Sequence, residues 1–180
     1  NAGRIFEFVN VSEKDKILFL NTLAALFVPG VARPAVVFTG PQGSGKSHGA
    51  KRLKETIDPG NPTLTMLPRK AEDFDLILCR YYVLANDNLS GMLPDIADTI
   101  CGVVTGAAPQ RRKLHTDNEI MTLQADVCLV FTGITALSNR PDFMERTLRV
   151  QLERIENIDR ITDDELDPVF ADALPEILGG

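Results

Sequence analysis

Eight consecutive residues have the types and the spacing that hold a nucleoside triphosphate. They are Gly40, Pro41, Gln42, Gly43, Ser44, Gly45, Lys46 and Ser47, with His48 directly behind them. This stretch fits the pattern G-x-x-x-x-G-K-[ST], in which glycines let backbone amides approach phosphate oxygens closely. The lysine then reaches the β- and γ-phosphates, and the serine hydroxyl ligates Mg2+. We therefore predict that ATP and Mg2+ bind at residues 40–48.

The elements expected around this loop suit that chemistry. An apolar strand is predicted over 35–39, and a helix is predicted from the loop to about Thr56. The N-terminus of such a helix has free N–H groups and a partial positive charge, which favour an anion. The alternative is a glycine-rich turn that only resembles the motif. A strand before the loop and a helix behind it argue against that alternative.

A magnesium site of this kind also needs an acidic residue at the end of a neighbouring buried strand. Asp87 fits this requirement, because it lies two residues after the apolar run 81–85; an aspartate that caps the next turn is the alternative. Many P-loop ATPases follow this acid with a glutamate that polarises the attacking water. Asn88 occupies that position here, and an amide cannot act as a base. Either hydrolysis is slow, or another carboxylate such as Glu119 serves.

Three further side chains could complete such a site. Thr132 directly follows the predicted strand 127–131, where its hydroxyl could contact the γ-phosphate or the attacking water, or could simply end the strand. Arg146 directly precedes the predicted strand 147–152, and Arg140 lies shortly before it. An arginine held there can stabilise transition-state charge in a neighbouring subunit, as arginine fingers do. The alternative is that both are surface arginines paired with nearby carboxylates.

A basic β-hairpin is predicted ahead of the strand that leads to Thr132. Its two arms cover 110–115 and 119–123, with a tight turn between them. The candidate contacts to DNA are Arg111, Arg112, Lys113 and His115. In a ring, such hairpins would line one pore, and their charges would add at a single nucleic-acid strand. The alternative is an exposed hairpin whose charges only solvate it, and no aromatic residue lies at its tip to stack on bases.

Predicted strands and helices alternate along the rest of the chain. Helices are expected from Ser12 to the Pro29-Gly30 stop, over 72–79, from Pro94 to Val104, around 136–139 and after Glu165, and a short strand is expected over 63–67. Alternation of this kind produces a parallel sheet with the ligand at the carboxyl ends of its strands. We therefore predict an α/β protein, a three-layer α/β/α P-loop NTPase with a parallel sheet and an added hairpin.

The composition is that of a single globular domain. Of the 180 residues, 44% are hydrophobic and 24% are charged, and no apolar stretch is long enough to suggest a membrane span. A net charge of −6 argues against a protein that binds nucleic acid through a generally basic surface. Cys79, Cys101 and Cys128 have no metal-binding spacing. We expect them to be reduced core residues of a cytoplasmic protein.

With these pieces in order, the chain resembles the AAA+ ATPases. The order is phosphate loop, acid-bearing strand, helix, hairpin, a strand ending in threonine, and an arginine before a last strand. More closely, the chain is similar to helicase-like ATP-binding proteins of bacteriophages and mobile elements, of the phage primase/helicase type. The stretches that carry this resemblance are GPQGSGKS, NDNLSG with LPDIADTICGVVTGAA, RRKLHTDNE, FTGI, RPDFMERTL and the terminal F-x-x-x-L-P-E-I-L-G.

The resemblance implies a role for each matching residue. Lys46 and Ser47 would bind phosphate and Mg2+, and Asp87 would be the Walker B acid. Thr132 would take the sensor 1 place, where many AAA+ proteins have asparagine. Arg146 would take the place of the arginine finger.

The resemblance also implies how the chain is organised. An ATPase core is expected over 1–169 and the start of a helical lid over 170–180, where the lid is cut short. The chain opens on Asn1 without a methionine, which suggests a fragment. When full length, such a protein would assemble into a homo-oligomeric, hexameric ring.

Three functions are compatible with these residues. The first is an ATP-driven motor or remodeller acting on DNA during phage or mobile-element replication. The second is a nucleotide-dependent loader or binding module with little turnover, which Asn88 in the usual base position favours. The third is a small-molecule P-loop kinase, which would need no hairpin and no arginine ahead of the last strand.

Overall fold

The computed structural model covers the whole chain and describes residues 1–31, 33–108, 110–112, 120–122, 126–134, 137–156 and 161–179. The helices are η1 (Ala2–Glu7), η2 (Glu13–Asp15), α1 (Lys16–Leu26), α2 (Lys46–Ile57), α3 (Ala71–Leu78), α4 (Pro94–Val104), α5 (Pro141–Glu145) and α6 (Asp163–Gly179). The strands are β1 (Ala35–Thr39), β2 (Val83–Leu89), β3 (Gln110–Arg112), β4 (Ile120–Thr122), β5 (Cys128–Gly133) and β6 (Thr147–Gln151). Among the described residues, no helix is long and apolar enough to cross a bilayer.

The centre of the molecule is a four-stranded sheet in the order β2-β5-β1-β6. All three strand pairs are parallel, with Val36 opposite Val130 and Phe38 opposite Val150. The predicted parallel α/β architecture is therefore confirmed. Because the strands are parallel, their carboxyl ends share one edge of the sheet, and the residues that follow them lie close together there.

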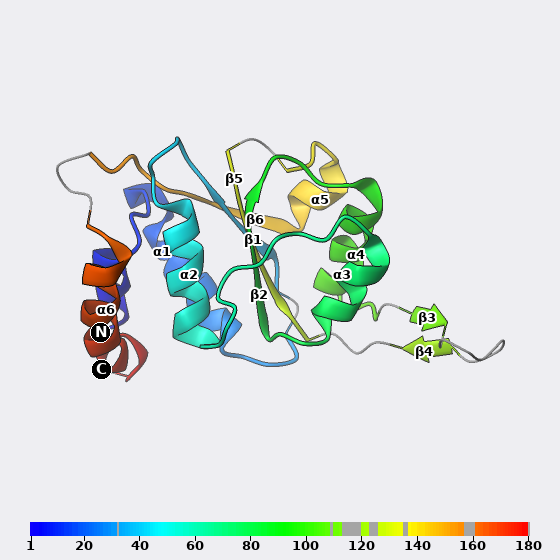
Figure 1. Cartoon of the computed structure of the whole chain (residues 1–180), viewed down its shortest axis with the longest axis horizontal. Helices are drawn as coiled ribbons and strands as arrows, with labels where there is room; N and C mark the ends of the chain where they lie inside the picture. The colour runs from blue at the N-terminus through cyan, green and yellow to red at the C-terminus, as the bar shows by residue number, and fades with distance from the viewer. Residues whose placement is uncertain are drawn as a thin grey trace.

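Alternation along the strands divides the core into two layers. Val36 and Phe38 face a cluster that contains residues of α1 and α2, whereas Ala35 and Val37 face a cluster built with α3, α4 and α5. Figure 1 shows the helices on both sides of the sheet accordingly. Successive strand residues point to opposite faces, so a strand covered on both sides must be apolar throughout. The predicted three-layer arrangement is thus confirmed.

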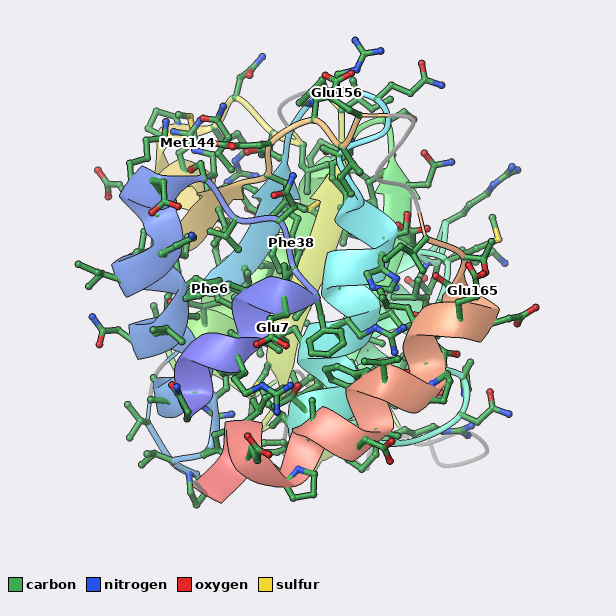
Figure 2. The ribbon with its side chains drawn as sticks, turned by 90° about the vertical axis from the view of Figure 1, so that its left-hand side faces the viewer. Phe6, Glu7, Phe38, Met144, Glu156 and Glu165 are labelled. Carbon is green, nitrogen blue, oxygen red and sulfur yellow. The ribbon has the colours of Figure 1, made fainter. Side chains whose placement is uncertain are left out.

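The last helix packs beside the beginning of the chain. The ring of Phe170 on α6 meets that of Phe8 edge-on, with 5.0 Å between centroids and 78° between planes. Figure 2 looks onto this face, where η1 crosses between α1 and α6. The predicted division between 169 and 170 falls inside α6, so the separation of a core from a lid remains a prediction.

The hairpin is present in its predicted place. Strands β3 and β4 pair antiparallel, with Gln110 opposite Thr122 and Arg112 opposite Ile120. The turn between them lies outside the described residues, as do Lys113, His115 and Glu119. Their proposed roles stay predictions.

Three local expectations are wrong. Residues 137–139 are not helical, and the helix begins instead at Pro141, because a fixed proline φ and a missing N–H suit the first helical position. The acid-bearing strand is Val83–Leu89 rather than 81–85, since its backbone stays paired with β5 past the apolar run. Cys79 is exposed, because it ends α3 on the solvent side, whereas Cys128 is buried as expected.

Candidate nucleotide-binding site

The loop between β1 and α2 needs glycine at two positions for different reasons. Gly45 directly precedes α2 with φ 75°, a left-handed angle that side chains disfavour. Gly40 has φ 153°, and a Cβ on it would lie 2.6 Å from the backbone oxygen of Leu152 and 2.7 Å from Ser44 Oγ. The loop can therefore close tightly only because both residues lack a side chain.

The loop presents donors around a small space. Lys46 Nζ donates to the backbone oxygens of Gly40, at 3.0 Å, and of Pro41, at 2.8 Å. The hydroxyl of Ser44 is buried and has no hydrogen-bond partner in the part of the chain that the structure describes. The first amides of α2, among them those of Ser47 and His48, have no intrahelical acceptor, and no side chain caps them. This arrangement fits an anion that accepts several hydrogen bonds.

Asp87 is held by the neighbouring strand. Thr132 Oγ1 donates to Asp87 Oδ1 at 2.5 Å and accepts the backbone N–H of Asn88 at 2.8 Å. Thr132 is only 1% exposed, so this hydroxyl is shielded from water. Asn88 adopts a left-handed φ of 56°, which asparagine tolerates better than most residues. Thr132 therefore orients the acid, a role that the residue type alone did not reveal.

The two candidate arginines both contact their own chain. Arg146 Nη1 donates to the backbone oxygen of Asp142 at 2.9 Å, and its Nε is buried with no partner among the described residues. Arg140 forms ion pairs with Asp98 at 2.5 Å and with Asp142 at 2.7 Å, and its side chain is 39% exposed. The hydrogen bond with Arg140 lowers the pKa of Asp142.

A cavity of about 550 Å3 opens beside the phosphate loop. Its walls are the loop residues 43–45 with His48, the N-terminal residues 6–10, the segment 153–156, and Ile161, Asp163 and Leu166. A mononucleotide fits a space of this size. Sequence reasoning missed this cavity, since none of its walls outside the loop carries a motif.

Two backbone contacts bring the distant walls to the loop. Glu153 N donates to Asn10 O at 3.0 Å, which fastens the N-terminal segment to the residues behind β6. Ile155 N donates to Gly43 O at 3.2 Å, and a Cβ on Gly45 would lie 3.2 Å from Ile155 Cδ1. The segment 153–156 therefore lies directly against the loop.

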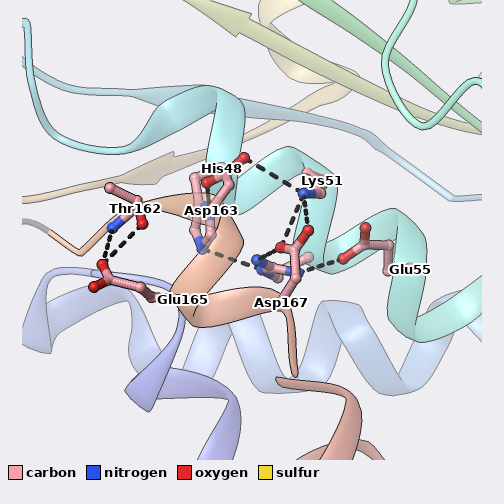
Figure 3. A network of polar contacts seen from close by, with 8 residues as sticks. His48, Lys51, Glu55, Thr162, Asp163, Glu165 and Asp167 are labelled. Atoms are coloured by element: carbon pink, nitrogen blue, oxygen red, sulfur yellow. Dashed lines mark hydrogen bonds and ion pairs between the residues drawn. The ribbon is translucent and has the colours of Figure 1, made fainter. Parts of the chain in front are cut away.

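His48 links the loop helix to α6, as Figure 3 shows. Its Nε2 accepts from Arg52 Nε at 3.1 Å, so its proton lies on Nδ1, which faces Asp163 Oδ1 at 3.0 Å. Burial and the charge of Arg52 lower the pKa of His48, although Asp163 opposes them. The imidazole is therefore neutral and uses both nitrogens within the protein.

Lys51 and Arg52 extend this link along the two helices. Arg52 is 1% exposed; it pairs with Asp167, donates to Glu55 at 2.8 Å and lies 4.7 Å from the Phe170 ring centroid. Lys51 lies 2.9 Å from Asp167 and 3.4 Å from an oxygen of Asp163. We call His48, Lys51, Arg52, Asp163 and Asp167 the α2–α6 clamp. It fixes the first turns of α6 to the helix that begins at the phosphate loop.

Several solved structures are similar to this chain in fold. The apo C-terminal region of NrS-1 gives a TM-score of 0.61 at 15% identity, covering 93% of this chain and 41% of that chain. JCV helicase gives 0.54 at 15% identity, covering 98% of this chain and 52% of the helicase. NtrX from Brucella abortus in complex with ATP gives 0.51 at 16% identity, covering 99% of this chain and 45% of that chain.

At these low identities the structural similarity establishes the fold, which is that of the P-loop NTPases. The chain spans about half or less of the length of these structures. None of the curated protein sequences matches it. The family model of the actinomycete integrative conjugative element replication proteins matches residues 3–180. The chain therefore belongs to the family of actinomycete integrative conjugative element replication proteins.

Proposed function

We propose that this chain binds ATP with Mg2+ at residues 40–48 and hydrolyses it as the core of a motor that acts on DNA during replication of a mobile element. The observation that carries the proposal is the loop itself. Its glycines adopt left-handed backbone angles, its buried Ser44 hydroxyl has no hydrogen-bond partner among the described residues, and no side chain caps the first amides of α2. The family description and the similarity to helicase structures support a role in replication. NtrX, a further protein of this fold, has been solved with ATP and with ADP.

Lys46 would hold a phosphate without leaving the loop. Its ammonium has three donors, and the carbonyls of Gly40 and Pro41 take two of them. The third donor is available to an oxygen of the β- or γ-phosphate. The lysine would therefore neutralise charge there while the carbonyls keep its position fixed.

Ser47 and Asp87 would hold the metal ion. Mg2+ binds few protein oxygens and completes its octahedron with water and substrate phosphate. The described residues contain no cluster of three or more histidine, cysteine or acidic side chains that could hold an ion by themselves, which suits this mode of binding. When bound, the ion would supply charge neutralisation at the transferred phosphate. The hydrogen bond from Thr132 would keep Asp87 in place for it.

The geometry favours Arg140 over Arg146 as the arginine that acts on a neighbouring subunit. Arg146 is folded against α5 through its bond to the Asp142 carbonyl, and its Nε is buried. Arg140 is more exposed and is held by two solvent-accessible carboxylates, which are weak partners that it can exchange for phosphate oxygens.

Release of phosphate by the full-length protein, with and without single-stranded DNA, tests the proposed activity. Lys46→Ala should reduce turnover by about 100-fold or more, because it removes a preorganised charge at the phosphates. Lys70→Ala is the matched control, since Lys70 is exposed and lies just ahead of α3, away from the loop. Lys113→Ala should reduce the stimulation by DNA only. Unchanged DNA-stimulated turnover in the Lys46 and Lys113 variants would contradict the motor.

Mixing two inactive variants tests the trans-acting arginine. A Lys46→Ala subunit retains its arginine, and an Arg140→Ala subunit retains its phosphate loop. If Arg140 acts across an interface, the mixture should regain part of the activity that each variant lacks alone. Recovery with Arg146→Ala but not with Arg140→Ala would reverse the assignment.

A second candidate is a nucleotide-dependent loader with little turnover. Asn88 favours it, because its exposed amide occupies the position where a water-activating glutamate is expected. Tight ATP binding with negligible phosphate release, even with DNA present, would decide for the loader.

A further inference from the structure

Asp163 lies in the cavity beside the phosphate loop, which a bound nucleotide would enter. It is the first residue of α6, and it lines the cavity together with residues 43–45 and His48. With the phosphates held by the loop as proposed, the sugar is the next group along the nucleotide. The ribose would then occupy the part of the cavity beside His48 and Asp163.

The side chains at this end of the cavity differ in whether they can accept a further hydrogen bond. The His48 ring uses Nε2 for Arg52 and Nδ1 for Asp163, and Lys51 is only a donor. The Asp163 carboxylate accepts one contact on each oxygen, from His48 at 3.0 Å and from Lys51 at 3.4 Å. Each carboxylate oxygen can accept about two hydrogen bonds, and the side chain is 60% exposed. Asp163 therefore has acceptor positions left, and ribose hydroxyls are donors.

Other carboxylates line the cavity, but they are less suited to accept hydrogen bonds from a ligand. Glu7 is engaged by Arg4 through two hydrogen bonds. Glu153 and Glu156 form no side-chain hydrogen bond or ion pair with the described residues, so binding would have to order them first. Two donors on α2, the His48 Nδ1–H and the Lys51 ammonium, already hold Asp163, which removes that cost.

The start of α6 has a cap and an anchor besides Asp163. The Thr162 backbone N–H and hydroxyl both donate to Glu165 Oε2, at 3.1 and 2.8 Å, which caps the helix. Asp167 ties the same turn to Lys51 and Arg52. The helix therefore has its own cap and anchor, and the Asp163 carboxylate is left to face the cavity.

We propose that Asp163 accepts hydrogen bonds from the ribose hydroxyls of the bound nucleotide and so makes the site favour nucleotides whose sugar carries these hydroxyls. This inference rests on the proposed nucleotide site. It assigns the sugar specificity of that site to a residue of α6, outside the phosphate loop.

Binding of ATP and of 2′,3′-dideoxy-ATP, measured by calorimetry with Mg2+ on the full-length protein, tests the inference. The wild-type protein should bind the dideoxy nucleotide about tenfold more weakly, at the low end for charged hydrogen bonds because solvent reaches the carboxylate. In Asp163→Ala this ratio should fall to about one. Asp167→Ala is the matched control, because it removes a carboxylate from the same clamp that does not line the cavity, and it should keep the tenfold ratio.

The outcomes separate the role of Asp163 from the existence of the nucleotide site on which that role rests. A wild-type protein that binds both nucleotides equally, or a ratio that Asp163→Ala leaves unchanged, would overturn the role of Asp163 alone. A wild-type protein that binds neither nucleotide would overturn the nucleotide site itself. If Asp163→Ala does not fold, the wild-type ratio and the Asp163→Asn ratio decide, since the neutral amide should weaken the preference.

Discussion

Replacing Thr132 with valine removes one hydroxyl and changes little else, because the two side chains have nearly the same shape. That hydroxyl joins the Asn88 N–H to the Asp87 carboxylate, and Thr132 is 1% exposed. In the valine variant the Asn88 N–H still points at a side chain that is 1% exposed, and it loses its acceptor there. An unsatisfied buried donor costs about 1–3 kcal/mol. Asp87 is half-buried and can be rehydrated, so it adds little to this cost. We expect Thr132→Val to lower the free energy of unfolding by about 1–3 kcal/mol.

Urea unfolding followed by circular dichroism measures this change, provided that the slope of the free energy of unfolding against urea concentration is the same in both proteins. Thr132→Ser is the matched control, because serine keeps the hydroxyl and loses only a methyl group, at about 1 kcal/mol. The valine variant should also need more Mg2+ to bind ATP, since Asp87 is no longer oriented. A valine variant that is as stable as wild type and binds Mg2+ and ATP equally well would refute the reasoning about Thr132.

Three further changes have expected outcomes. Gly40→Ala should weaken binding of a fluorescent ATP analogue by at least about tenfold, because its Cβ would lie 2.6 Å from the Leu152 backbone oxygen; an unchanged dissociation constant would contradict the loop geometry. Asn88→Glu should raise phosphate release in the presence of Mg2+, by up to about 100-fold if a base is all that is missing, and no increase would place the base elsewhere. Hydrogen bonds from the cations of α2 lower the pKa of Asp167, so its stabilising contribution is complete above its unfolded pKa and is lost as pH falls through the lower folded pKa. The midpoint temperatures of thermal unfolding of wild type and Asp167→Asn should therefore approach each other as the pH falls below about 4. A difference between the two midpoints that stays constant with pH would contradict the ion pairs.

The phosphate loop and the sheet could be predicted because their signals are local. Gly40 and Gly45 stand at positions where a side chain would clash or strain the backbone, and the motif places them at a fixed spacing. The apolar run of β1 is covered on both faces, which is why it shows no alternation. Local rules of this kind need no knowledge of distant contacts.

The cavity could not be predicted because its walls meet only in the folded chain. Phe8 and Phe170 come from opposite ends of the sequence and pack edge to face. His48 directly follows the motif, yet nothing near it in sequence indicates that Asp163 will accept a hydrogen bond from it. The single signal in the sequence is chemical: Lys51 and Arg52 are basic on a helix that must be partly buried, so they need carboxylate partners.

The side chains of Thr132 and Asn88 are both unsuited to act as the catalytic base. Asn88 is an amide, and the Thr132 hydroxyl already accepts from the Asn88 backbone and donates to Asp87. Neither side chain can therefore take a proton from an attacking water. Asp87 is the carboxylate of this group, and as the proposed Mg2+ ligand it would be a poor base, because a bound cation lowers the proton affinity of its ligands. If the chain hydrolyses ATP, the rate must depend on groups other than Thr132, Asn88 and Asp87, such as Arg140 of a neighbouring subunit. Hydrolysis would then be slow in a monomer and would rise on assembly, so turnover per subunit should increase with protein concentration.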